Sequence, residues 1–389
     1  MNEYICPNCF ANDIETFFEV KNTPVHNTLL LDSEKEALEF PKGDISLGLC
    51  KDCSFIYNTA FDPSVHQYSE KYEETQGFSP TFRAFHKQLA ETLIEKHQLH
   101  GRKVIEIGCG KGEFLALLCD LGSCDVVGFD PAYVSDRKPS QIKGNMEVVV
   151  DFYSEKYQDY KADFVCCKMT LEHIPNTKEF ITTVRKSLNQ SEQALVFFQV
   201  PNMSYVLNEA AFWDIYYEHC SYFTKESLTH LFEDCGFEIK DVWTDYQDQY
   251  LMIEAVPSTK MKTSSSHSLE KTKSRINQFL EKDSALVQKW KERLKEIKEK
   301  QLKAVIWGGG SKGVAFLSRL GIHDEISYAV DVNPYKDGKY MAGTGQRIVS
   351  PSFLAEYKPD IVIIMNPIYH NEIESMLNEM NLYPEIIDL

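Results

Sequence analysis

The chain has 389 residues, 43% hydrophobic and 25% charged, a composition typical of a globular protein with two or three domains. Its 41 Lys and Arg against 58 Asp and Glu give a net charge of −17, which argues against a nucleic-acid or anionic-membrane surface. No apolar run approaches the roughly 20 residues of a membrane helix, and the N-terminus does not resemble a signal peptide, so we expect a cytoplasmic protein with mostly reduced cysteines.

Two cysteine pairs lie near the N-terminus. Cys6 and Cys9 form one C-x-x-C pair, and Cys50 and Cys53 form another, forty residues later. Two residues between paired cysteines allow one tight turn to direct both thiolates at a single ion, and two such turns complete a tetrahedral shell of sulfur atoms. A redox-active dithiol would need only one pair. We therefore predict a structural Zn²⁺ in a small module over residues 1–72.

A strand, a glycine turn and a helix follow the helix predicted over 81–97. The strand at 103–107 leads into glycines at 108, 110 and 112, which allow the backbone to approach a ligand closely. The next predicted strand, 126–129, ends in Asp130, where an α/β unit binds a ribose diol. Further strands are predicted at 147–150, ending in Asp151 and Phe152, and at 163–168.

The form E-x-G-x-G-x-G, together with Asp130, Asp151 and Leu171-Glu172-His173, resembles class I S-adenosylmethionine-dependent methyltransferases. The resemblance implies an S-adenosylmethionine domain over 73–258, with the ribose on Asp130 and the adenine beside Asp151 and Phe152. The cofactor-binding residues expected from it are Glu106, Gly108, Cys109, Gly110, Gly112, Asp130, Pro131, Asp151, Phe152 and Lys168. His173 is not assigned a catalytic role, because this segment is usually structural in the family.

Reactive side chains are most concentrated in residues 212–223, which follow the strand predicted at 194–200. This position lies at the sheet edge where α/β folds bind ligands. A His beside a Glu, with phenols nearby, suits proton abstraction from an acidic C–H, and a Tyr hydroxyl can donate to the enolate oxygen formed. The alternative is an aromatic segment that packs under a lid while its polar groups satisfy one another.

The cysteine pairs, the methyltransferase motifs, Tyr-x-Glu-His followed by Tyr-Phe, and a third α/β domain together resemble the three-domain sugar C-methyltransferases. These enzymes methylate a ring carbon next to a ketone in nucleotide-linked deoxysugars. By this resemblance His219 would be the general base, with Glu218 and Tyr216 as its partners. A Tyr of the zinc module would close over the substrate; of the candidates Tyr68 and Tyr72, we favour Tyr72.

A basic connector precedes the third domain. Residues 260–303 contain thirteen Lys or Arg and six Asp or Glu, a net charge of +7. The stretch 263–268 is predicted to be a polar hinge, and apolar residues recur over 269–302 at the spacing of an amphipathic helix. We interpret this helix as lying on acidic neighbours rather than binding nucleic acid, although its apolar stripe also suits packing against a second copy of the chain.

The third domain, 303–389, opens with a second strand and glycine turn. Its G-x-G-x-x-G spacing, and an Asp 18 residues after the last glycine, would by themselves favour a dinucleotide. The resemblance instead implies the diphosphate of a nucleotide-sugar substrate, bound by backbone N–H groups and Lys312. NAD(P) binding and a purely structural domain remain alternatives. The substrate-binding residues expected are Gly308, Gly310, Lys312, Gly313, Asp331 and Asn366.

The sequence thus predicts an α/β protein: a class I methyltransferase Rossmann-like domain flanked by a small N-terminal zinc-binding module and a second C-terminal Rossmann-like domain, with 259–302 as linker and helix. The expected activity is S-adenosylmethionine-dependent C-methylation of a nucleoside-diphosphate sugar by a monomer or homodimer, with no nucleic-acid or membrane partner. The rivals are methylation of O, N or carbon in another small molecule, and a catalytically silent nucleotide-binding protein.

Overall fold

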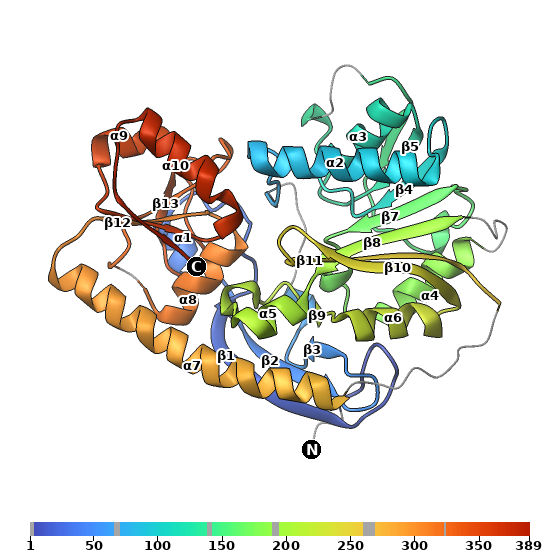
Figure 1. Cartoon of the computed structure of the whole chain (residues 1–389), viewed down its shortest axis with the longest axis horizontal. Coiled ribbons are helices and arrows are strands. Elements are labelled where there is room, and N and C mark those ends of the chain that lie inside the picture. Colours follow the sequence, from blue (N-terminus) through green and yellow to red (C-terminus); the bar gives the residue numbers. More distant parts are fainter. Residues whose placement is uncertain (1–3, 66–70, 138–141, 189–193, 260–268, 323) are drawn as a thin grey trace.

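Three β-sheets form the framework of the protein (Figure 1). The computed structural model describes residues 4–65, 71–137, 142–188, 194–259, 269–322 and 324–389. Within these ranges, no helix combines the length and the apolar character needed to cross a membrane.

The N-terminal sheet has four strands, and one of them comes from residues 212–223, the segment predicted to be catalytic. Strands β1 (Ile14–Pro24), β2 (Lys42–Cys50) and β3 (Ile56–Asn58) pair antiparallel in chain order, with the short helix α1 (Glu34–Leu38) between β1 and β2. The fourth strand, β9 (Ser221–Tyr222), pairs antiparallel with β3. Because β9 begins two residues after His219, this pairing ties the candidate base to the N-terminal sheet.

The middle sheet has seven strands in the order β10-β11-β8-β7-β4-β5-β6. Strands β8, β7, β4, β5 and β6 are parallel to one another. Strand β11 pairs antiparallel with β8, and β10 pairs antiparallel with β11 at the edge of the sheet. Their bounds are β4 (Lys103–Ile107), β5 (Asp125–Phe129), β6 (Met146–Val149), β7 (Phe164–Lys168), β8 (Leu195–Pro201), β10 (Phe237–Asp245) and β11 (Tyr250–Pro257).

Helices cover both faces of the middle sheet. On one face, α2 (Pro80–His97) and α3 (Glu113–Gly122) share a core with Val104 and Phe164; on the other, α4 (Thr177–Ser187) and α6 (Lys225–Asp234) share one with Ile105 and Val165 (Figure 1). Neighbouring strand residues point to opposite faces, so apolar pairs such as Val104-Ile105 are needed when both faces are buried. Helix α3 starts directly after the glycine turn, which places that turn at the carboxyl end of β4.

The C-terminal sheet is parallel throughout, in the order β14-β13-β12-β15-β16. Its elements are β12 (Ala304–Trp307), α8 (Ser311–Leu320), β13 (Tyr328–Val330), β14 (Arg347–Val349), α9 (Leu354–Tyr357), β15 (Ile361–Ile364), α10 (His370–Glu379) and β16 (Glu385–Asp388). The remaining helices are α5 (Met203–Glu209) and the 3₁₀ turns η1 (Pro63–Val65), η2 (Ser135–Arg137), η3 (Glu155–Tyr157), η4 (Leu171–His173), η5 (Phe212–Asp214), η6 (Pro351–Phe353) and η7 (Pro367–Tyr369).

Helix α7 (Leu269–Glu299) runs beneath the N-terminal sheet and continues along the C-terminal domain (Figure 1). Phe279, near its start, packs in the core of the N-terminal sheet, while Trp290 and Leu294 pack in the C-terminal core. The apolar stripe is therefore buried by this chain itself. Basic residues of α7 pair with acidic neighbours, as Arg293 does with Glu385. The predicted hinge 263–268 lies outside the described residues.

Candidate active site

A cavity of about 660 Å³ extends from the carboxyl edge of the middle sheet to the glycine turn before α8. All four predicted catalytic residues and all six predicted substrate-binding residues line it. Eight of the ten predicted cofactor-binding residues do so as well; Gly112 and Asp151 are absent from the described residues that form its wall. One continuous space thus joins two glycine turns that are about 200 residues apart in the sequence.

The cofactor end of the cavity is formed by the first glycine turn and two carboxyl groups. Gly108, with φ of 69°, and Gly110, with φ of 53°, adopt the left-handed backbone that glycine tolerates best. Asp130 accepts a hydrogen bond of 2.9 Å from the Gly110 N–H. Glu106 is 2% exposed; burial raises its pKa to about 7, although the nearby charge of Lys168 opposes this rise. This wall therefore suits a ligand that carries positive charge and hydroxyl groups.

Asp151 is bound by neighbouring side chains and is absent from the described residues that line the cavity. Its carboxylate accepts hydrogen bonds from the Tyr157 hydroxyl (2.6 Å) and the Lys156 ammonium (3.0 Å), and these bonds lower the pKa of Asp151. Its neighbour Phe152 does line the cavity, with a side chain that is 60% exposed. The aromatic face predicted for an adenine is present, whereas the acid is bound by neighbouring side chains.

Glu218 is held by the N-terminal module. It is 1% exposed and accepts hydrogen bonds from His26 Nδ1 and the Asn27 N–H, both at 2.9 Å, and from the Tyr72 hydroxyl at 3.4 Å. Burial raises the pKa of Glu218, but the His26 hydrogen bond and the charges of His173 and His26 outweigh burial, so the net shift is downward. Glu218 is therefore an ionised carboxylate directed at His26 rather than at its sequence neighbour His219.

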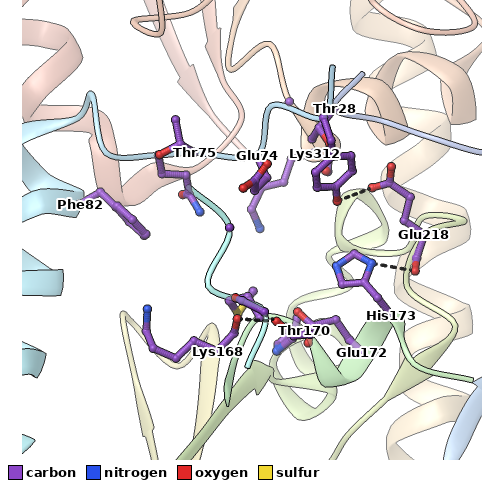
Figure 2. A pocket seen from close by; sticks show the side chains of 18 of the residues that line it. Thr28, Glu74, Thr75, Phe82, Lys168, Thr170, Glu172, His173, Glu218 and Lys312 are labelled. Carbon is purple, nitrogen blue, oxygen red and sulfur yellow. Dashed lines mark hydrogen bonds between the residues drawn. The ribbon is translucent and has the colours of Figure 1, made fainter. Parts of the chain in front are cut away.

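His219 lies among aromatic rings and faces a different carboxyl group. It is 3% exposed, with its ring centroid 4.0 Å from that of Tyr216 and 4.8 Å from that of His173. Its Nε2 lies 3.9 Å from Oε1 of Glu172. Figure 2 shows Glu172 and His173 side by side at the wall of the pocket, with His173 Nδ1 bonded to the Glu218 carbonyl oxygen at 3.0 Å. One carboxyl oxygen of Glu172, one ring nitrogen of His173 and one ring nitrogen of His219 lie within 4.8 Å of one another.

The short segment 72–75 lies beside the cavity, and Tyr72, Glu74 and Thr75 line it. Its four side chains contact different parts of the chain. Tyr72 donates to Glu218, Glu73 accepts two hydrogen bonds from the Arg137 guanidinium, Glu74 lies against Gly110, and Thr75 donates to Glu113. Tyr68, the other candidate for the closing Tyr, lies outside the described residues.

The C-terminal end of the cavity repeats the arrangement found at Asp130. Asp331 accepts hydrogen bonds from the Gly309 N–H at 3.0 Å and from the Lys336 ammonium at 3.1 Å, beside the second glycine turn. Lys312 forms an ion pair with Asp214 of the predicted catalytic segment. The Asn366 and Gln249 amides bond reciprocally at 2.9 and 3.0 Å. Lys336 was not predicted as a site residue, yet it is buried and lines the cavity with its ammonium beside Gly310.

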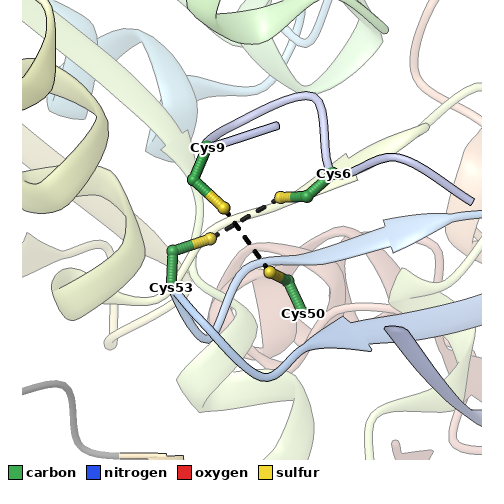
Figure 3. Close-up of side chains that lie close together, drawn as sticks. All are labelled: Cys6, Cys9, Cys50 and Cys53. Carbon is green, nitrogen blue, oxygen red and sulfur yellow. Dashed lines mark hydrogen bonds between the residues drawn. The ribbon is translucent and has the colours of Figure 1, made fainter. Parts of the chain in front are cut away.

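The four N-terminal cysteines form a cluster (Figure 3), and none of them lines the cavity. The sulfur atoms of Cys6 and Cys53 lie 3.6 Å apart, as do those of Cys9 and Cys50, and all four are within 4.8 Å of one another. Sulfur atoms at about 2.3 Å from a tetrahedral Zn²⁺ would be separated by about 3.8 Å. The four side chains therefore fit a zinc ion closely.

Several site residues escaped prediction from the sequence. Glu172 and His173 were noticed in the sequence as part of the methyltransferase pattern but were given no role, although they follow β7 at the same sheet edge as the glycine turn. Glu73, Arg137 and Lys336 had no comparable signal, because they meet only when three separate segments fold together.

Comparisons with known proteins agree with the two larger predicted domains. Residues 66–242 match a family model described as a methyltransferase domain, and residues 258–382 match one described as a C-methyltransferase C-terminal domain. The C-methyltransferase NovU of Streptomyces niveus is 25% identical over 409 aligned positions, covering 98% of this chain and 91% of NovU.

Solved structures resemble this chain more distantly. Magnesium protoporphyrin IX methyltransferase (ChlM) from Synechocystis PCC 6803, with bound SAH, is 16% identical with a TM-score of 0.36, covering 46% of this chain and 84% of that one. A putative S-adenosylmethionine-dependent methyltransferase from Listeria monocytogenes is 14% identical with a TM-score of 0.34, covering 45% of this chain and 99% of that one.

Proposed function

We propose that this chain, which is an S-adenosylmethionine-dependent methyltransferase with the C-terminal domain of C-methyltransferases, methylates a carbon next to a ketone in a deoxysugar linked to a nucleoside diphosphate. The observation that carries the proposal is the single cavity lined by His219, by the first glycine turn and by the second. A base between two nucleotide-type sites suits a reaction that joins a cofactor to a nucleotide-linked substrate.

His219 is the proposed general base. It removes a proton from the carbon next to the ketone, and the electron pair remains on the substrate as an enolate. Tyr216, whose ring packs on His219, is the proposed donor to the enolate oxygen. Burial, together with nearby acidic groups, raises the pKa of Tyr216 well above its usual value, so its hydroxyl stays protonated and able to donate.

The proposed cofactor-binding groups are Glu106, Asp130 and the first glycine turn. S-adenosylmethionine supplies an electrophilic methyl group on a sulfonium, so the protein's contribution to the methyl step is mainly orientation and exclusion of water. Tyr72 is proposed to position the substrate, through its place beside Glu218 at the cavity wall.

The second glycine turn is the proposed site of the substrate diphosphate. Backbone N–H groups at the start of α8 suit an anion, and two ammonium groups support this assignment, those of Lys312 and Lys336. Each is paired with a carboxylate, Lys312 with Asp214 and Lys336 with Asp331. A bound diphosphate would therefore share these cations with the protein's own acids.

The cysteine cluster is the proposed site of a structural Zn²⁺. Four thiolates fill a tetrahedral shell and leave no position for water, so the ion would stabilise the module without taking part in the reaction.

The domain boundaries stay a prediction: 1–72 for the zinc module, 73–258 for the methyltransferase domain, 259–302 for the linker and helix, and 303–389 for the C-terminal domain.

Hydrogen exchange at carbon tests the proposal. A thymidine-diphosphate-linked 4-keto-6-deoxyhexose incubated with the enzyme in deuterated water should incorporate deuterium next to the ketone, and S-adenosylmethionine should convert the sugar to a C-methyl product. His219→Ala should retain S-adenosylmethionine binding and lose turnover by at least about 100-fold. Turnover near that of the wild type would remove His219 from the mechanism, and methylation of O or N without exchange would favour a different acceptor.

A further inference from the structure

Glu172 is a buried carboxyl group with an unusual lack of partners. It is 1% exposed and lines the cavity, and neither of its carboxyl oxygens has a hydrogen-bond partner among the described residues. Burial of a carboxyl group without a partner is costly, so such a group is exceptional in a folded protein. Its position in η4, directly after β7, places it at the sheet edge that faces the catalytic segment.

The proposed base lies close to this carboxyl group. Oε1 of Glu172 lies 3.9 Å from Nε2 of His219. The other carboxylate close to His219 in the sequence, Glu218, is bound to His26 and Asn27. The acid available to His219 is therefore Glu172 and not its sequence neighbour. A separation of 3.9 Å is longer than a hydrogen bond, but such contacts shorten when substrate binds.

We propose that Glu172 is the positioning residue of His219: it holds Nε2–H and balances the charge of the imidazolium formed during proton abstraction. The inference rests on the proposed role of His219. The C–H bond of the substrate breaks, its electron pair stays on the substrate as the enolate, and the proton goes to Nδ1. Glu172 remains a carboxylate throughout, so no further oxidant, reductant or proton carrier is needed.

The ability of His219 to accept a proton then depends on whether Glu172 is ionised. Burial raises the pKa of Glu172 to about 8, so its carboxylate forms as the pH rises through this value. The titratable groups that face it come from β7, η4, the catalytic segment and β11: Cys167, His173, Tyr216, His219, Cys220 and Tyr250. None of these is Lys or Arg. Turnover should therefore increase as the pH rises through about 8.

The test compares Glu172→Gln with the wild type in the exchange reaction over pH 6–9. Glu172→Gln keeps the size of the side chain but cannot carry charge, so exchange should fall by about 100-fold and lose its increase near pH 8. Glu172→Asp should restore part of the rate together with the pH dependence. S-adenosylmethionine affinity should stay within about twofold in both variants, because neither change reaches the cofactor wall.

Glu254→Gln is the matched control, because Glu254 is also 1% exposed but pairs with Lys96 and His97 outside the cavity. It should leave the pH profile unchanged. Exchange by Glu172→Gln at the wild-type rate and pH profile would overturn the inference while leaving the proposed function intact. Absence of exchange in the wild type would overturn both. Turnover that requires added Mg²⁺ or Mn²⁺, with cation binding lost in Glu172→Gln, would instead assign the carboxyl group to a metal.

Discussion

Replacement of Glu73 by Ala should destabilise the protein, because this one carboxylate joins three segments. Glu73 is 1% exposed; it accepts hydrogen bonds of 3.1 and 2.7 Å from Arg137 and one of 2.9 Å from the Asn333 side chain. The substitution leaves a largely buried guanidinium and an amide donor without their acceptor.

The structure sets the size of the effect. Removing one partner of a buried ion pair costs about 3–5 kcal/mol. The Arg137 side chain is 18% exposed and keeps its stacking contact, with the guanidinium carbon 3.7 Å from the centroid of the Tyr335 ring, so we expect the lower end, about 3 kcal/mol. The unfolding entropy of a 389-residue unit is about 0.8 kcal/mol per kelvin, which converts this loss to a Tm decrease of about 4 °C.

Thermal denaturation followed by circular dichroism or calorimetry measures the decrease. Glu91→Ala is the control, because Glu91 forms an exposed ion pair with Lys87 on α2 and should barely change the Tm. Glu73→Gln should lie between the two, since its amide oxygen can still accept from Asn333. A Glu73→Ala variant with a Tm within about 1 °C of the wild type would refute the claim that this carboxylate stabilises the contact between the three segments.

Three further predictions concern the metal, the cofactor and the substrate. Cys9→Ser should lower the zinc content from one equivalent per chain and lower the Tm; elemental analysis showing unchanged zinc would contradict the four-sulfur site. Because the carboxylate of Glu106 forms as the pH rises through about 7, S-adenosylmethionine should bind up to about tenfold more tightly at pH 8 than at pH 6, and calorimetry of Glu106→Gln should show no such change. Lys312→Gln should raise the substrate KM about tenfold or more, whereas Asp214→Asn should not raise it, because that change releases the Lys312 ammonium; an equal increase in both would indicate that the pair only positions the catalytic segment.

The longer strands and helices of the fold could be predicted from the sequence. Strands predicted at 103–107, 126–129 and 163–168 match β4, β5 and β7 to within one residue, and the helix predicted at 81–97 matches α2 equally well. These elements combine regular apolar patterns with glycine or capping signals, which act locally. β9 could not be predicted, because a strand of two residues has no pattern of its own and forms only by pairing with β3.

In the candidate site, too, some features follow from local sequence patterns and others depend on tertiary packing. Glu106 lies near the carboxyl end of β4, and Asp130 and the glycine turns directly follow strands, so their positions follow from the topology of a parallel sheet. The partner of a side chain does not: Glu218 follows the sequence pattern of a partner for His219, yet it bonds to His26, 192 residues away. Whether a carboxylate faces the residue beside it depends on packing from the other segments, which the sequence pattern does not encode.

The β3–β9 pairing means that the methyltransferase domain alone does not contain everything the proposed reaction needs. The middle sheet, with its glycine turn and Asp130, is complete without the N-terminal module. The segment that carries His219, however, leaves that sheet, contributes β9 to the N-terminal sheet, and has Glu218 fixed by His26. A fragment limited to the methyltransferase domain would therefore keep its cofactor pocket while its proposed base lost the framework that orients it. The N-terminal module, although its four cysteines do not line the cavity, is in this sense part of the catalytic unit.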